Sequence, residues 1–135
     1  MITAIDTSVL IDVFGADARF GAASSEALRR CLNEGAVVAC MAVWSETRVA
    51  FADDQSFAHA MRTLGVGYSG PSQEAALLAG AVCKKYRAGG GPRDRVIADF
   101  LIGAHAATQC DRLLSRDPGY YRKHFSGLVI VDPSA

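Results

Sequence analysis

Two kinds of hydrophobic pattern alternate along this chain. Short continuous apolar runs are typical of buried strands, whereas apolar residues that recur every three to four positions are typical of amphipathic helices. We expect strands at residues 2–5, 36–43, 65–68, 113–115 and 128–131. We expect helices at residues 9–14, 24–32, 44–51, 56–64, 72–83, 95–108 and 120–124. Strands that alternate with helices predict an α/β fold, here a three-layer α/β/α sandwich with a mostly parallel central sheet.

Two of the predicted helices can be described in more detail. The helix that opens at 72–74 should bury a face formed by Ala76, Leu77, Gly80, Ala81 and Cys83. The glycine-rich segment 88–92 should then form a loop, and Asp94 should cap the helix that follows.

No repeat or linker divides the chain, so we expect one domain spanning residues 1–135. The longest apolar run, 36–44, has nine residues, whereas a membrane-spanning helix needs about 20. The N-terminus lacks the basic region and the long apolar stretch of a signal peptide. Four separated cysteines, with no Cys-x-x-Cys pair, indicate core residues in a reducing compartment rather than a zinc site or a disulfide framework. We therefore expect a cytoplasmic protein with no membrane contact.

Charge is unevenly distributed along the chain, although the formal net charge is zero. Residues 1–83 contain five Lys and Arg against nine Asp and Glu, whereas residues 84–124 contain nine against four. If the basic side chains of the second segment converge, they would form a phosphate-attracting face. A scattered, solvated surface is an equally good interpretation of the same segment.

Four acidic residues occur where a carboxylate contributes little to folding. Asp6 and Asp117 follow predicted strands, and Glu46 is expected in the first turn of the helix after the second strand. Asp99 lies within RVIADFLIGAHA, where apolar residues surround it. Ligand sites of parallel sheets lie beyond the carboxyl ends of the strands, so the four carboxylates could converge there. Such a cluster of oxygen ligands would bind Mg²⁺ or Mn²⁺, which many nucleases use to cleave phosphodiesters.

Each acid also has a purely structural explanation. Asp6 can cap the helix that follows it, Glu46 can stabilise a helix N-terminus, and Asp117 can open an Asp-Pro-Gly turn. Asp99 is the hardest to explain in this way, because a buried carboxylate is normally paired or bound to a cation. The combination of the four, rather than any one of them, favours a metal site.

Other catalytic motifs are missing from the sequence. The GGGP loop lacks the Gly-Lys-Ser/Thr ending of a P-loop, no Gly-x-Ser-x-Gly elbow is present, and the three histidines form no metal-binding pair. Ser115 is therefore predicted to orient a water or an acid beside the site rather than to act as a nucleophile.

Four segments together resemble the PIN-domain ribonucleases, and especially the VapC toxins of toxin–antitoxin modules. They are IDTSVLIDVF at the start, AVWSETRVAF around Glu46, RDRVIADFLIGAHA around Asp99 and LLSRDPGYYRKHFSGLVIVDP near the end. The similarity extends over nearly the whole chain. It implies a PIN-like sandwich with an acidic pocket for Mg²⁺ or Mn²⁺ and endoribonuclease activity. By position, the family's four acids correspond to Asp6, Glu46, Asp99 and Asp117, and Ser115 stands where the family has a Thr or Ser.

The resemblance also implies partners. Members of the family usually form homodimers, and a cognate VapB-like antitoxin inhibits them by laying its C-terminal segment, often with an arginine, across the acidic groove. We therefore expect an RNA substrate, an antitoxin and a toxin–antitoxin hetero-oligomer.

A mechanism can be written as a hypothesis on these residues. Asp6 and Asp99 would carry the main metal ion, and Glu46 and Asp117 would complete the pocket or hold a second ion. Water would attack the phosphate in line and leave a 5′-phosphate and a 3′-hydroxyl. The candidate phosphate anchors are Arg93, Arg95 and Arg116.

Two other functions stay open on the sequence. The same fold could be a non-catalytic module whose acidic pocket binds a basic peptide or a structural cation, and the zero net charge slightly favours this. A receiver-like phosphoacceptor domain is disfavoured. It needs a second acid beside Asp6 and a lysine at a late strand end, where Ser115 and Arg116 stand.

Overall fold

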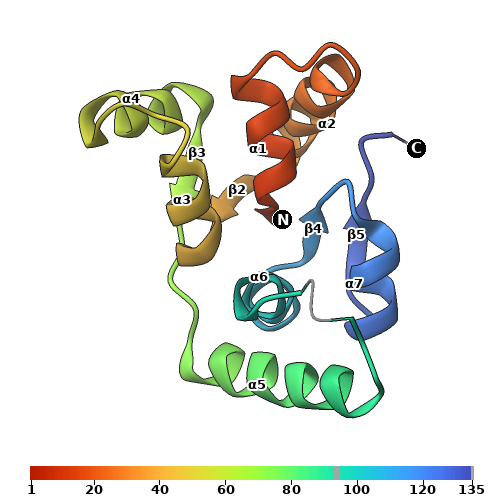
Figure 1. Cartoon of the computed structure of the whole chain (residues 1–135). Coiled ribbons are helices and arrows are strands. Elements are labelled where there is room, and N and C mark those ends of the chain that lie inside the picture. Colours follow the sequence, from red (N-terminus) through yellow and green to blue (C-terminus); the bar gives the residue numbers. More distant parts are fainter. Residues whose placement is uncertain (93–94, 135) are drawn as a thin grey trace.

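Five parallel strands form the central sheet in the computed structural model, which describes residues 1–92 and 95–134 (Figure 1). Their order across the sheet is β3-β2-β1-β4-β5, so that β1 lies in the middle. The strands are β1 (Ile2–Ile5), β2 (Ala36–Ala39), β3 (Val66–Tyr68), β4 (Arg112–Leu114) and β5 (Val129–Val131).

The described part of the chain also contains seven helices, which form two layers. Figure 1 shows α1 and α2 on one side of the strands and α5 and α6 on the opposite side. The predicted three-layer α/β/α fold with a parallel central sheet is therefore confirmed. The helices are α1 (Thr7–Phe14), α2 (Gly21–Glu34), α3 (Met41–Arg48), α4 (Asp54–Leu64), α5 (Gln73–Ala88), α6 (Ile97–Gln109) and α7 (Pro118–His124).

The central strand β1 determines where polar groups can gather. It pairs with β2 on one side and β4 on the other, and its residues Ala4 and Ile5 are almost completely buried. The backbone N–H of Asp6 still donates to the carbonyl of Leu114, 2.9 Å away. Asp6 consequently leaves the sheet at its middle, where the chains that follow β2 and β4 leave it as well.

The predicted strand at 36–43 is wrong in its second half. Strand β2 ends at Ala39, Cys40 has the extended backbone of an N-cap, and α3 begins at Met41. Backbone pairing explains the early end, because the registers of β2 with β1 and β3 cover only residues 36–39. In the helix Val43 is buried, whereas Met41 is 49% exposed. Glu46 therefore lies in the second turn of α3 and not in the first turn, where the apolar pattern predicted it.

The predicted apolar face of the helix at 72–83 is correct at Cys83 and wrong at its other four positions, which are exposed. Ala75, Ala79 and Cys83 are the buried residues of α5, whereas Leu77 is 67% exposed and Gly80 is exposed. The three buried residues recur every four positions, and their small side chains let α5 pack closely on α6. The apolar pattern favoured burial of the large Leu77. Close packing of α5 on α6 instead buries the small residues Ala75 and Ala79.

Helix α6 begins later than predicted. Its first residue is Ile97 and its N-cap is Val96, while the predicted cap, Asp94, lies outside the described residues. Asp99 is consequently in the first turn of α6 rather than in its interior.

All four cysteines are free thiols, as expected for core residues. Cys31, Cys40 and Cys83 are buried, and Cys110 is half-buried. No helix in the described part of the chain combines the length and the apolar character that crossing a membrane requires.

Candidate active site

A pocket of about 370 Å³ opens where the chain leaves β1, β2 and β4. The four carboxylates singled out from the sequence all line it, together with two arginines. The lining residues are Asp6, Thr7, Ser8, Glu46, Arg95, Asp99, Ile102, Arg116 and Asp117. The fold thus brings acids from four separate segments to one edge of the sheet.

Asp6 is the most deeply placed of the four acids, with 9% of its surface exposed. One carboxylate oxygen accepts from the backbone N–H of Thr7 at 2.8 Å, which caps α1. The other accepts from Ser115 Oγ at 2.7 Å and from the phenol of Tyr121 at 3.3 Å. Burial raises the pKa of Asp6, and the three hydrogen bonds offset part of that rise. The structural and the functional interpretation of Asp6 are therefore compatible, since it caps a helix and still faces the pocket.

Glu46 reaches the pocket from α3. It is exposed, and its Oε1 accepts a 2.7 Å hydrogen bond from Thr7 Oγ1. The negative charge of Glu46 contributes to the raised pKa of Asp6. The helix-dipole explanation does not apply, because Glu46 is not in the first turn of α3.

Asp99 is half-buried at the start of α6, and its Oδ2 accepts from the backbone N–H of Val96 at 3.0 Å. This bond satisfies one of the backbone donors at the helix terminus. Asp99 therefore has one of the partners that a carboxylate among apolar residues was expected to need, a backbone N–H at the helix terminus. Asp99 lies in the first turn of α6 and lines the pocket, although its neighbours in the sequence are apolar.

Asp117 follows β4 at the N-cap position of α7 without capping it. Its carboxylate forms a 2.7 Å ion pair with Arg95, and its backbone N–H donates to Ser115 Oγ at 3.0 Å. Ser115 is fully buried and joins Asp6 to Asp117, which is consistent with its predicted orienting role.

The three predicted phosphate anchors have different environments. Arg95 is paired with Asp117, and its guanidinium carbon lies 4.1 Å from the ring centre of Tyr120. Arg116 lines the pocket and forms an ion pair with Asp12 of α1. Arg93 lies outside the described residues.

Sequence reasoning missed Asp12. This residue is 3% exposed in α1 and binds both Arg116 and the hydroxyl of Ser24. The signal was present, because Asp12 stands among apolar residues in IDTSVLIDVF just as Asp99 does in its own segment. An acid in such a place needs a partner.

The donors of the pocket can be compared with the needs of a divalent cation. Carboxylates and hydroxyls are the oxygen ligands that Mg²⁺ and Mn²⁺ prefer, and Ser8 Oγ is buried there with no hydrogen-bond partner among the described residues. Within residues 1–92 and 95–134, however, no three His, Cys, Asp or Glu side chains are grouped as a metal site. The residues thus fit a hard cation in kind, while protein donors occupy the carboxylates of Asp6, Glu46, Asp99 and Asp117.

Comparison with known proteins gives one family match. The model of the PIN domain matches residues 3–125, which is most of the chain. Among curated proteins, none has a sequence that matches this chain.

Solved structures share the fold at low sequence identity. VapBC2 from Rickettsia felis, bound to a DNA fragment from their promoter, aligns with a TM-score of 0.76 at 12% identity over 98% of both chains. A toxin–antitoxin complex from Klebsiella pneumoniae gives 0.66 at 20% identity over 97% of both. VapC20 of Mycobacterium tuberculosis, a toxin that cleaves the sarcin–ricin loop, gives 0.64 at 15% identity over 97% of this chain and 99% of that one.

Proposed function

This chain belongs to the PIN domain family, and from that membership we propose that it is a Mg²⁺- or Mn²⁺-dependent endoribonuclease, the toxin of a toxin–antitoxin pair. One observation carries the proposal: Asp6, Glu46, Asp99 and Asp117 come from four segments of the chain and line a single pocket at the carboxyl end of the sheet.

Asp6 and Asp99 would hold the main cation, and Glu46 and Asp117 would complete its site or hold a second one. When bound, the cation would activate a water and stabilise the leaving oxygen of an in-line displacement at phosphorus. The products would be a 5′-phosphate and a 3′-hydroxyl.

The remaining polar residues of the pocket would position the reactants. Ser115 holds Asp6 and the backbone of Asp117 in one arrangement through its hydroxyl. Arg95 and Arg116 would contact phosphate oxygens, and Arg93 is a third candidate from the sequence. Because Arg95 is paired with Asp117, an RNA phosphate and a cation at Asp117 would together replace that ion pair.

The proposed partner is a VapB-like antitoxin, with the toxin itself a cytoplasmic homodimer that joins it in a hetero-oligomer. The structural similarity to a toxin–antitoxin complex and to VapBC2 supports this partner. A basic side chain of the antitoxin placed among the acids would compete for the carboxylates that the cation needs.

A cleavage assay on RNA tests the proposal. Purified wild-type protein, free of antitoxin, should cleave RNA with Mg²⁺ or Mn²⁺ and should stop when a chelator is added. Asp6→Asn should reduce cleavage to the level of the chelated sample, with an unchanged circular dichroism spectrum. Glu26→Gln is the matched control, because Glu26 is an exposed carboxylate on α2 that pairs with Arg29 and does not line the acidic pocket. Equal cleavage by wild type and Asp6→Asn would refute the assignment of the site.

A non-catalytic module is the second candidate, and one observation favours it. Each of the four carboxylates already has a protein donor, and the donor to Asp117 is an arginine, the group that a basic peptide would present. Under this alternative the folded protein would bind a basic peptide, and no RNA would be cleaved with either metal.

A further inference from the structure

Two further cavities continue from the acidic pocket across the surface of α5 and α7. The first, of about 510 Å³, shares Arg95 with the acidic pocket and also contacts Arg87 and Val96. The second, of about 400 Å³, shares Tyr86, Gly91 and Pro92 with the first and ends at Lys85, Lys123 and His124. Each cavity shares lining residues with the next, so the three lie next to one another. We call the two outer cavities the basic track beyond Arg95.

The basic track carries positive charge that no described residue neutralises. Lys85, Arg87 and Lys123 are exposed and form no ion pair with any described residue. No carboxylate is found among the described residues that line the two outer cavities. The arginines at the acidic pocket, in contrast, are paired with Asp117 and Asp12. Uncompensated cations along a groove attract a chain of phosphates.

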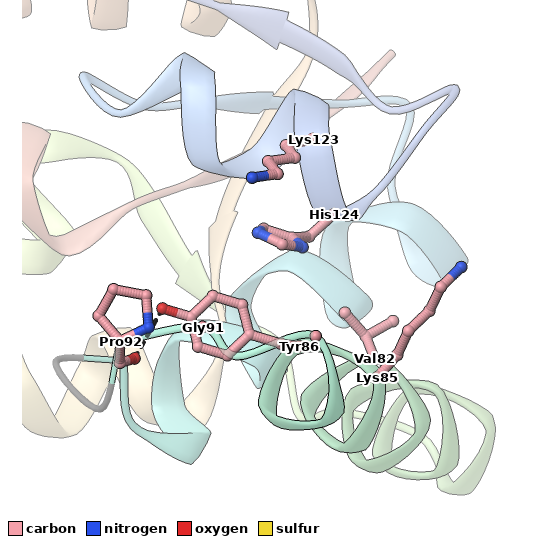
Figure 2. Close-up of a pocket in the computed structure, with 8 residues that line it drawn as sticks. Val82, Lys85, Tyr86, Gly91, Pro92, Lys123 and His124 are labelled. Carbon is pink, nitrogen blue, oxygen red and sulfur yellow. Dashed lines mark hydrogen bonds between the residues drawn. The ribbon is translucent and has the colours of Figure 1, made fainter.

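Aromatic rings accompany these cations. The His124 ring lies 5.1 Å from the Tyr86 ring and 5.2 Å from the Tyr120 ring, measured between centroids. Figure 2 shows Lys123 and His124 of α7 above Tyr86 of α5, with the amine of Lys85 directed away from Lys123. Proteins that bind single-stranded nucleic acid pair its phosphates with cations and stack its bases on accessible rings. Here the rings that line the outer cavity are those of Tyr86 and His124, both half-buried.

The wall of the outer cavity is held in place by the turn after α5. The Tyr86 hydroxyl donates to the carbonyl of Pro92 at 2.7 Å, and the N–H of Gly91 donates to the carbonyl of Tyr86 at 3.0 Å (Figure 2). A Cβ at Gly91 would lie 2.6 Å from the Tyr86 ring, so only glycine lets the turn pack directly on it. The Tyr86 ring is therefore held in place before any ligand binds.

We propose that single-stranded RNA follows the basic track, from the acidic pocket past Arg95 and Arg87 to the outer cavity that Lys85, Lys123 and His124 line. This inference rests on the proposed function and specifies its substrate: an unpaired RNA segment long enough to reach several nucleotides beyond the scissile bond. An acidic peptide would use the cations of the track but would have no need of the path that joins them to the acidic pocket.

Binding of a fluorescein-labelled single-stranded RNA of about 12 nucleotides, a length within the usual site sizes, tests the track. Chelator is present, so that no RNA is cleaved, and fluorescence anisotropy reports the Kd. Lys85→Ala with Lys123→Ala should weaken binding about tenfold or more and make it less dependent on salt, since two phosphate contacts are lost. The control pair Lys84→Ala with Arg122→Ala removes equal charge from exposed neighbours that do not line the track. It should change the Kd less than threefold.

Cleavage with metal separates this inference from the proposed function. The Lys85/Lys123 pair should slow cleavage of the long RNA, whereas the Lys84/Arg122 pair should cleave it at the wild-type rate. If wild type cleaves RNA but the two pairs bind it equally, the track is wrong and the nuclease assignment stands. If the pairs differ in binding but wild type cleaves nothing, the proposed function fails and the track remains an RNA-binding surface. If the Lys85/Lys123 pair keeps its RNA affinity and loses binding to a poly-glutamate peptide, the surface serves an acidic protein partner and the inference is overturned.

Discussion

The carboxylate of Asp12 holds the guanidinium of Arg116 at two points, with Oδ2 2.5 Å from Nε and Oδ1 3.1 Å from Nη2. Arg116 lies between Ser115 and Asp117, and its guanidinium also packs 4.0 Å from the ring centre of Phe20. The ion pair therefore links the segment that follows β4 to α1. This segment contains Arg116 and Asp117, which line the acidic pocket.

Asp12→Ala should lower the free energy of unfolding by about 2–4 kcal/mol, somewhat less than the cost of breaking a fully buried pair, because the side chain of Arg116 is 26% exposed. Urea denaturation followed by circular dichroism measures this change. Glu26→Gln, which breaks the exposed pair with Arg29, should stay within about 0.5 kcal/mol of wild type. Equal effects of the two substitutions would mean that the Asp12 pair does not stabilise the fold.

Ser115→Ala should slow RNA cleavage about 10–100-fold, the usual effect of removing a group that orients a metal ligand. The substitution leaves Asp6 without its 2.7 Å hydrogen bond and the N–H of Asp117 without an acceptor. Tyr121→Phe removes only a 3.3 Å contact with Asp6 and should have a clearly smaller effect. Single-turnover cleavage rates compare the two. A larger loss in Tyr121→Phe would show that the phenol, and not Ser115, controls Asp6.

Two glycines should respond to alanine with opposite signs. A Cβ at Gly103 in α6 would lie 2.3 Å from the buried ring of Phe125, so Gly103→Ala should destabilise the protein by about 1–3 kcal/mol. Gly80 is exposed within α5 and has open space at its Cβ position. Gly80→Ala should stabilise by about 0.5–1 kcal/mol through helix propensity alone. Thermal unfolding of the two variants beside wild type checks both signs, and the same sign for both would contradict the packing described for α6.

Lowering the pH should destabilise the protein through His105. This histidine is 1% exposed, its Nε2 lies 2.9 Å from Ser69 Oγ, and burial lowers its pKa. In the unfolded chain the imidazole is protonated near pH 6.5, whereas in the folded protein it stays neutral to a lower pH. Protonation therefore favours the unfolded state, and stability falls as the pH drops below about 6.5. The loss continues down to the lowered pKa of the folded state.

Denaturation midpoints between about pH 7.5 and pH 5.5 measure this dependence. His105→Gln should show a shallower fall than wild type. Some fall should persist, because the pKa of His124 is lowered as well. An unchanged slope in His105→Gln would exclude His105 as its source.

The carboxylates at the strand ends can be identified from the sequence alone, for a local reason. Asp6 directly follows an apolar run and Asp117 closely follows another, and parallel strands direct whatever follows them to one edge. The strand–helix alternation likewise predicts the layered sandwich, because it depends on periodicity within short segments. Which donor binds each of the four acids cannot be predicted in this way. Ser115, for example, donates to Asp6 although the two are 109 residues apart in the sequence.

What the sequence determined by itself was the set of elements and the edge of the sheet at which the acids gather, because strand and helix patterns are written in neighbouring residues. Only the tertiary structure decided the partners. The strand order β3-β2-β1-β4-β5 places β1 at the centre of the sheet. The packing of the elements brings Arg116 to Asp12 and places the basic residues of α5 and α7 around neighbouring cavities. It also buried Ala75 and Ala79 in place of Leu77. These outcomes depend on which surfaces meet at close range, and no local pattern of hydrophobic residues contains that information.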